Sequence, residues 1–264
     1  AAEKKAGRIA AEGIVDTKVS EDGKVASMVE VNCETDFVAK NDTFKSFVAA
    51  VAAQAAKTNA TNIDEFLAEK WEQDPTKTVK EALASMIAVI GENMNIRRFE
   101  KITVENGFVA SYIHGGGRIG ILVEVETPAV NDEVKEAAKN VAMQIAAMKP
   151  KFVRREDAPE DFIEHEKNII KAQIMNDPAN SKKPENIIEK MIEGRLSKEM
   201  KEMCLLDQVY VKDSEMSVGQ YLESVSKQVG APIVIKRFVR FETGEGIEKK
   251  SEDFAAEVAK QMGL

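Results

Sequence analysis

Residues 29–42, VEVNCETDFVAKND, decide the fold because they join a strand pattern to a helix pattern. The run from Met28 to Cys33 alternates in character and is rich in β-branched residues, as is typical of a strand. The residues that follow predict a helix from Thr43 to Lys57, because apolar side chains recur there at helical spacing, namely Phe44, Phe47, Val48, Val51, Ala52 and Ala55.

The turn between strand and helix is Thr35-Asp36-Phe37, an acid and an aromatic behind a residue that favours helix N-termini. One interpretation makes Asp36 a helix cap and Phe37 a core residue. The other makes both of them contacts for a partner. These residues alone leave the two interpretations open.

The elements around this stretch form a recognisable order. Two strands, Gly13 to Val19 and Lys24 to Cys33, flank the turn residues Ser20-Glu21-Asp22-Gly23. Beyond the long helix we expect a helix around Ile63 to Glu72 and another that begins at Asp74-Pro75-Thr76 and ends at Gly91. A third strand then runs from Asn95 to Val104.

The same order begins again later in the chain. Gly107-Phe108-Val109 repeats Gly13-Ile14-Val15 at a spacing of 94 (107 − 13), and Leu122 to Val125 repeats Met28 to Val31 at the same spacing. Asn131-Asp132 repeats Asn41-Asp42 at a spacing of only 90 (131 − 41). Ile235 to Phe238 echoes Ile96 to Phe99. Self-similarity of this kind predicts two related subdomains.

The change of spacing means that the first copy carries four more residues (94 − 90) between its second strand and its long helix. The surplus falls at Glu34 to Phe37, whereas the second copy makes the same connection with Glu126 to Val130 alone. The fold therefore does not require this turn. A surplus loop that carries an acid and an aromatic favours contact over core.

The second copy has its own insertion. Phe162 to Ile174 and Ile187 to Met203 are amphipathic and flank the breaker-rich segment Asn176 to Pro184, which predicts an antiparallel helical hairpin. The pair either packs within the core or projects as an arm, and the length of its helices favours the arm. A helix capped by Ser217, a strand from Pro232 to Phe241 and a final amphipathic helix from Ser251 to Gln261 complete the chain.

Composition bounds the function. The chain has 264 residues, of which 44% are hydrophobic and 31% charged, and its net charge is −8. The acidic balance argues against a direct nucleic-acid partner, and no apolar run approaches the ~20 residues of a membrane helix. The two cysteines, Cys33 and Cys204, show no metal-ligand spacing and fit a reducing compartment.

Covalent chemistry finds little support. His114-Gly115-Gly116-Gly117-Arg118 joins two strands and lacks the Gly-Lys-Ser/Thr ending of a phosphate-binding loop, so a flexible hairpin is favoured. The acids near the central turn lack calcium-loop spacing. We expect that the protein binds no metal or cofactor and is not an enzyme. A cysteine-dependent enzyme built around Cys33 stays open as an alternative, although no base lies near Cys33 in the sequence and a buried strand cysteine is far more common.

Four segments carry a family resemblance. Residues 30–42, IGENMNIRRFE from Ile90 to Glu100, HGGGRIGIL from His114 to Leu122 and residues 244–259 resemble elongation factor Ts, the guanine nucleotide exchange factor of elongation factor Tu. The resemblance covers nearly the whole chain. It implies that the protein binds elongation factor Tu carrying GDP and promotes exchange of GDP for GTP. The alternative is an interaction scaffold without exchange activity.

The resemblance also implies where the partner is touched. Thr35, Asp36, Phe37 and Val38 would form the corner that disturbs the partner's magnesium site, so the magnesium belongs to the partner. The hairpin residues His114, Gly115 and Arg118 would contact the third domain of elongation factor Tu. Phe254 and Val258 would present the C-terminal helix to it. A homodimer through the C-terminal subdomain stays open, and we expect bacterial cytoplasm or an organelle matrix or stroma.

The predicted fold is α+β, with two duplicated subdomains that each hold a small antiparallel sheet and helices. We expect a linker remnant at 1–12, an N-terminal core subdomain at 13–105, and a C-terminal core subdomain at 106–247 with the helical hairpin at about 160–204. A C-terminal helical module follows at 248–264. The family's usual N-terminal helical domain is expected to be absent, which would weaken binding to the partner.

Overall fold

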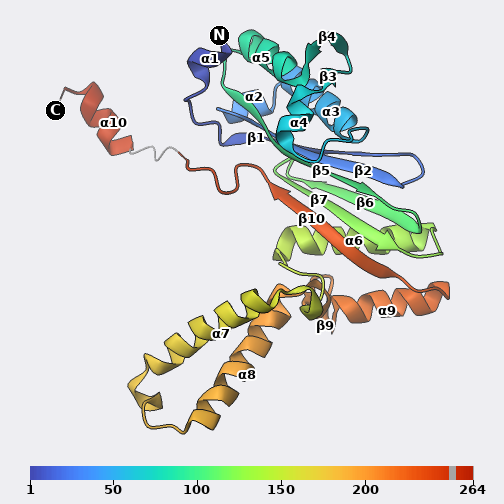
Figure 1. Ribbon diagram of the computed structural model, residues 1–264, viewed down its shortest axis with the longest axis vertical. Helices are drawn as coiled ribbons and strands as arrows, with labels where there is room; N and C mark the ends of the chain where they lie inside the picture. Colours follow the sequence, from blue (N-terminus) through green and yellow to red (C-terminus); the bar gives the residue numbers. More distant parts are fainter. Residues whose placement is uncertain (250–253, 264) are drawn as a thin grey trace.

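The computed structural model describes residues 1–249 and 254–263 and confirms an α+β fold (Figure 1). Two three-stranded antiparallel sheets form its centre. The first has the strand order β1 (Glu12–Val19), β2 (Val25–Cys33) and β5 (Met94–Thr103). The second has the order β10 (Val234–Glu242), β7 (Ile119–Glu126) and β6 (Gly107–His114).

The sheets pack against each other, and a helix covers the outer face of each one (Figure 1). Strand alternation explains this layering, because successive side chains point to opposite faces. Val29 and Val31 face α3 (Asp42–Ala55), while Ala26 and Met28 face the second sheet. α6 (Asp132–Met148) covers the second sheet in the same way. The cluster between the sheets draws on both of them: Val15, Ala26, Met28, Ile102, Val104, Val109, Leu122 and Phe241.

The predicted duplication is confirmed strand for strand. Gly13 pairs with Asn32 in the first sheet, and Gly107 pairs with Glu126 at the equivalent place in the second. In both sheets the second strand of the copy is central and the last strand of the copy is its neighbour. The two copies therefore share one topology as well as one sequence pattern.

The repeat also includes a small hairpin that the sequence analysis missed. β3 (Lys70–Trp71) and β4 (Asp74–Thr78) precede α5 (Val79–Ile90), and β8 (Val209–Tyr210) and β9 (Asp213–Ser217) precede α9 (Val218–Val229). The prediction that a helix begins at Asp74 is wrong. The Asp74 carboxylate accepts hydrogen bonds from the backbone and hydroxyl of Thr76, which holds a turn, and the helix cap is Thr78.

A buried glutamine anchors this hairpin in each copy. Gln54 of α3 donates to the Lys70 carbonyl at 2.9 Å and accepts from the Glu72 amide at 3.0 Å. Gln144 of α6 donates to the Val209 carbonyl at 3.0 Å and accepts from the Val211 amide at 2.9 Å.

α4 (Ile63–Ala68) ends earlier than expected, because the chain turns into β3 at Lys70.

The helical hairpin consists of α7 (Glu160–Met175) and α8 (Glu185–Met203), close to the predicted 160–204. The pair has its own apolar cluster, separate from the core beneath α6, and extends away from the sheets (Figure 1). The arm interpretation is therefore confirmed over packing within the core. Short 3-10 turns, η1 (Arg155–Asp157), η2 (Pro178–Asn180) and η3 (Leu205–Asp207), lie at its base and tip.

Two further short helices lie near the ends of the chain. α1 (Ala2–Lys5) occupies part of the stretch expected to be a linker, and Ala2 packs on the first core. α10 (Phe254–Gln261) covers most of the predicted final helix, whose first residues, 251–253, lie outside the described part. None of the helices in the described residues is both long and apolar enough to cross a membrane.

One buried carboxylate ties the end of the second sheet to the first. Glu30 is fully buried, and its Oε1 accepts from Arg98 Nε at 2.6 Å and from Arg97 Nη1 at 3.2 Å. Its Oε2 accepts from the Gly244 amide at 2.7 Å, just beyond β10. A bulge in β5 places two consecutive arginines against this one acid.

This arrangement predicts a large difference between two equivalent acids. Glu30→Ala should cost ~3–5 kcal/mol in the free energy of unfolding, because it leaves two half-buried guanidinium groups and a buried amide without their acceptor. The counterpart Glu124 has one looser ion pair, to Arg237 at 3.8 Å, so Glu124→Ala should cost less than ~1 kcal/mol. Denaturant unfolding of both variants measures the difference. Equal losses would contradict this account.

Candidate functional site

The four surplus residues of the first copy form a helical turn of their own. Asn41 caps α3 eight positions after Cys33 (41 − 33), whereas Asn131 caps α6 four positions after Thr127 (131 − 127). The additional chain makes α2 (Asp36–Ala39). We call residues 35–38 the corner.

The corner presents its aromatic side chain to solvent. Phe37 is 82% exposed, and Asp36 is exposed beside it. The cap of α2 is Thr35, whose Oγ1 accepts from the Val38 amide at 3.3 Å. The interpretation of Asp36 as the cap and Phe37 as core is therefore wrong. Val38 differs from its neighbours, because its side chain is partly buried against the first core and anchors the turn.

A carboxylate from a distant loop holds the start of the corner. Glu92 Oε2 accepts from the backbone amides of Glu34 and Thr35, each at 3.0 Å, and Glu92 Oε1 accepts from the Thr35 hydroxyl at 2.6 Å. In return, Glu34 Oε1 accepts from the Asn93 amide at 2.6 Å. We call this set, Glu34, Thr35, Glu92 and Asn93, the clasp.

The clasp was not predicted, although Glu92 and Asn93 lie inside the motif that starts at Ile90. Its members are separated by 58 residues (92 − 34), and nothing local pairs them. Arg8 adds an ion pair to Glu34 at 3.5 Å. The Cys33 thiol donates to the Thr35 carbonyl at 3.2 Å.

The predicted hairpin loop joins β6 to β7, two strands, as expected. His114 and Arg118 are exposed, and the Tyr112 hydroxyl lies 2.9 Å from His114 Nδ1. The base of the loop is fixed through Gly117, whose carbonyl accepts from the Val15 amide at 2.7 Å and from Thr243 Oγ1 at 2.9 Å. Gly117 has a φ of +105°, and an added Cβ would lie 2.6 Å from Ile14 Cγ2, so glycine is required there.

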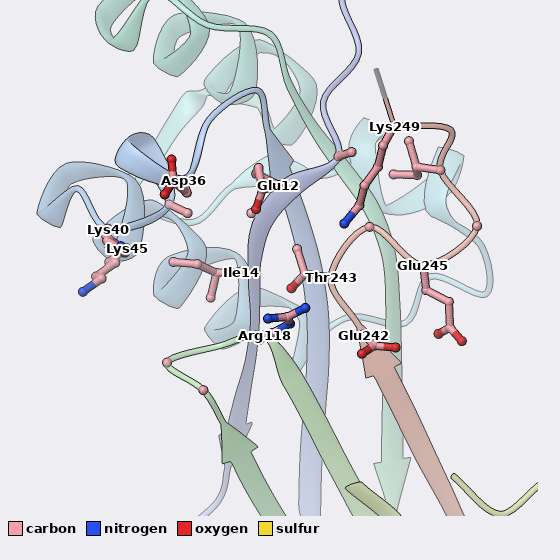
Figure 2. Close-up of a pocket in the computed structure, with 18 residues that line it drawn as sticks. Glu12, Ile14, Asp36, Lys40, Lys45, Arg118, Glu242, Thr243, Glu245 and Lys249 are labelled. Atoms are coloured by element: carbon pink, nitrogen blue, oxygen red, sulfur yellow. The ribbon is translucent and has the colours of Figure 1, made fainter. Parts of the chain in front are cut away.

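Corner and hairpin line one cavity of about 660 Å³ (Figure 2). Figure 2 shows Asp36, Lys40 and Lys45 on one side of it, and Arg118 near its middle with Thr243. The segment after β10 closes the other side, where Glu245 and Lys249 lie. The structure thus brings together Asp36, Gly115 and Arg118 from the predicted contacts. Thr35, Phe37, Val38 and His114 lie outside the lining.

The cavity mixes charges of both signs, and the described residues contain no group of three or more histidines, cysteines or acids placed to hold a metal. Its lining contains four carboxylates and four cations on flexible side chains, namely Glu12, Asp36, Glu242 and Glu245, and Lys40, Lys45, Arg118 and Lys249. Such a surface is suited to polar contact with another protein.

The C-terminal contacts stay a prediction. In Figure 1, α10 lies apart from the sheets, beyond the end of β10. Val258 is 38% exposed, while the side chain of Phe254 lies outside what the structure describes.

The cysteines do not resemble nucleophiles. Cys33 is fully buried, and burial together with the nearby Glu92 and Glu12 carboxylates raises the pKa of its thiol to about 12. Burial likewise raises the pKa of Cys204 to about 11. A cysteine nucleophile reacts as thiolate, which these surroundings disfavour.

Comparison with known proteins gives one consistent family. The family model described as "Elongation factor TS" matches residues 34–245. "Elongation factor Ts" of Clostridium perfringens (strain 13 / Type A) is 54% identical over 263 residues, covering 100% of this chain and 85% of that protein. The same-named proteins of Clostridium kluyveri (strain NBRC 12016) and Clostridium tetani (strain Massachusetts / E88) are 53% and 51% identical over 262 residues, 99% of this chain and 84% and 85% of theirs.

The exposure of Phe37 predicts that it adds little to stability. Phe37→Ala should leave the thermal midpoint within about 1 °C, because a side chain that is already in water loses little on truncation. Phe47, which is 5% exposed and packs on Trp71, is the matched control. Phe47→Ala should cost ~3–5 kcal/mol. A thermal melt of the two variants measures both effects, and a large drop for Phe37→Ala would make the corner structural.

The pKa of Cys33 predicts slow alkylation. The folded pKa of about 12 lies above the unfolded value of roughly 8.5, so ionisation of the thiol favours the unfolded chain. Its contribution to stability is complete below pH ~8.5 and is lost as the pH rises toward 12. At pH 8.5, iodoacetamide should label Cys33 slowly in the native protein and rapidly in denaturant, as peptide mass mapping would show. Fast native labelling would favour the cysteine-enzyme alternative.

Proposed function

The chain belongs to the elongation factor Ts family, and from this premise we propose that its corner carries out nucleotide exchange on elongation factor Tu. In this proposal Phe37 inserts between side chains of the partner near its nucleotide site. Asp36 competes for polar contacts around the partner's magnesium. The role in translation elongation follows from the family, while the assignment to these residues is ours.

The exposure of Phe37 is the observation that carries the proposal. A phenylalanine that is 82% exposed, at a turn that the fold does not need, gains most of its burial only when a partner covers it. Interface aromatics of this kind often contribute ~2 kcal/mol or more to binding. The second copy offers no equivalent side chain, because its connection lacks the surplus residues.

Exchange by this route needs binding energy and no bond chemistry. A factor that binds nucleotide-free elongation factor Tu more tightly than the nucleotide-bound form must weaken nucleotide binding by the same ratio. The protein itself would then need neither a catalytic residue nor a cofactor. We therefore propose that it is not an enzyme in the covalent sense.

The hairpin would supply a second contact at a fixed spacing from the first. Its base is bonded to β1 through Gly117, and its loop borders the cavity that Asp36 also lines. His114, Gly115 and Arg118 would touch the third domain of the partner while Phe37 reaches its nucleotide site. Phe254 and Val258 of α10 would add a third contact.

The remaining features of this proposal concern setting and assembly. We propose a cytoplasmic setting, and the bacterial origin of the similar proteins supports it. We propose no direct nucleic-acid or membrane partner. The homodimer through the C-terminal subdomain stays a prediction, which sedimentation of the purified protein would test.

The proposal predicts a specific loss in an exchange assay. With elongation factor Tu carrying fluorescent GDP and a fixed, subsaturating amount of factor, Phe37→Ala should slow GDP release roughly 30-fold, the equivalent of ~2 kcal/mol. The folded fraction of Phe47→Ala should release GDP at nearly the normal rate, because Phe47 lies on the inner face of α3.

Two outcomes would contradict the proposal. Normal release with Phe37→Ala would mean that the corner is not the exchange element. Binding of the unaltered protein to elongation factor Tu without any change in GDP release would identify an interaction scaffold instead.

A further inference from the structure

We infer that Glu92 is a positioning residue for exchange: it touches no partner itself but holds the corner in the orientation that presents Phe37. The inference rests on the proposed function of the corner. It assigns a role to a residue in the loop between α5 and β5.

The contacts of Glu92 are directed at the backbone where the corner begins. One carboxylate oxygen accepts from the amides of Glu34 and Thr35, and the other accepts from the Thr35 hydroxyl. That same hydroxyl oxygen accepts from the Val38 amide within α2. Glu92 therefore fixes the cap residue from outside, and the cap residue fixes the helical turn.

The return bond makes the arrangement mutual. Glu34 accepts from the Asn93 amide at 2.6 Å, so each of the two segments satisfies a backbone amide of the other. Rotation of the corner as a rigid unit would break several of these bonds together. Hydrogen bonds to charged groups are the stronger ones in proteins.

α2 has few other means of support. It is only four residues long, and isolated helices much longer than that are marginal in water. Phe37 contributes almost no burial, and Val38 and Ala39 are only partly buried. Besides the partial packing of Val38 and Ala39, the hydrogen bonds of the clasp restrain the direction in which Phe37 points.

The second copy provides an internal comparison. Its α9 ends at Gly230, as α5 ends at Gly91, and both glycines are left-handed. The next residues are Ala231 and Pro232, where the first copy has Glu92 and Asn93. Alanine has no carboxylate and proline has no amide hydrogen, so this clasp cannot form there. The loop folds without it, and the copy that lacks the corner also lacks the clasp.

A pre-organised corner binds better because its ordering is complete before the partner arrives. Without the clasp, residues 34–38 would have to be ordered during binding. Fixing even one residue's backbone is enough to weaken association about tenfold. The expected consequence is slower exchange with a fold that stays intact.

The test compares Glu92→Ala with Glu81→Ala. Glu81 also accepts a backbone hydrogen bond, from the Thr78 amide at 3.3 Å, but at the far end of α5. Glu92→Ala should slow fluorescent GDP release about tenfold and speed amide hydrogen exchange at residues 34–39, with β2 still protected. Glu81→Ala should change neither. Glu92→Gln keeps an acceptor for the two amides and should recover part of the rate.

A double variant separates this inference from the proposed function. If Glu92 acts through the corner, Glu92→Ala should add little to the loss already caused by Phe37→Ala. Fully multiplied losses would overturn the inference, as would normal release or unchanged amide exchange in Glu92→Ala. If Phe37→Ala itself releases GDP normally, the proposed function fails, whatever Glu92→Ala does to amide exchange.

Discussion

The buried carboxylate of Glu30 is the interaction on which the arrangement of the site depends. A charge taken out of water needs several strong partners, and the bulge in β5 supplies two arginines. The Asn32 side-chain amide and the Gly244 backbone amide also donate to Glu30, and the bond from Gly244 ties the chain after β10 to the first sheet. This segment carries Thr243 and Glu245, which close the cavity opposite Asp36. The hydrogen bonds that the buried Glu30 carboxylate needs therefore also position the segment after β10, which forms one side of the cavity.

Because the chain contains two copies of one unit, features common to both copies can be separated from features of one copy alone. Both copies keep the sheet, the covering helix, the buried glutamine and the small hairpin, so these features belong to the shared fold of the two copies. The surplus turn, the clasp and the fully buried acid occur in the first copy, whereas Glu124 at the place of Glu30 keeps one loose ion pair. These departures from the repeat lie at or beside the corner, residues 35–38, which we propose as the contact for the partner. The second copy instead devotes its added length to the arm.

Periodicity was sufficient to predict the strands of the two main sheets, the long helices, the arm and the position of the surplus residues. It failed at Asp74 to Thr78, where an acid followed by proline resembles a helix start but forms a turn within a short strand. It also missed Glu92, because a carboxylate that binds backbone amides 58 residues away leaves no pattern in either segment. Counting residues between the repeats predicted that Phe37 lies outside the core, and its side chain is exposed. The cavity is lined by four segments that are distant in the sequence, residues 11–14, 36–45, 115–118 and 242–249, so no local pattern predicts it.

Because Phe37 is exposed, its orientation has to be fixed by contacts other than its own packing. A core side chain helps to hold its own backbone in place by packing, but the Phe37 side chain cannot do so because it is exposed to solvent in the free protein. Its orientation must come from groups that are satisfied before any partner binds. Hydrogen bonds to the backbone can fix this orientation, because they are directional and leave the Phe37 ring free. We therefore regard Glu92 and Thr35 as part of the same device as Phe37, in which hydrogen bonds fix the direction and the aromatic ring supplies the contact.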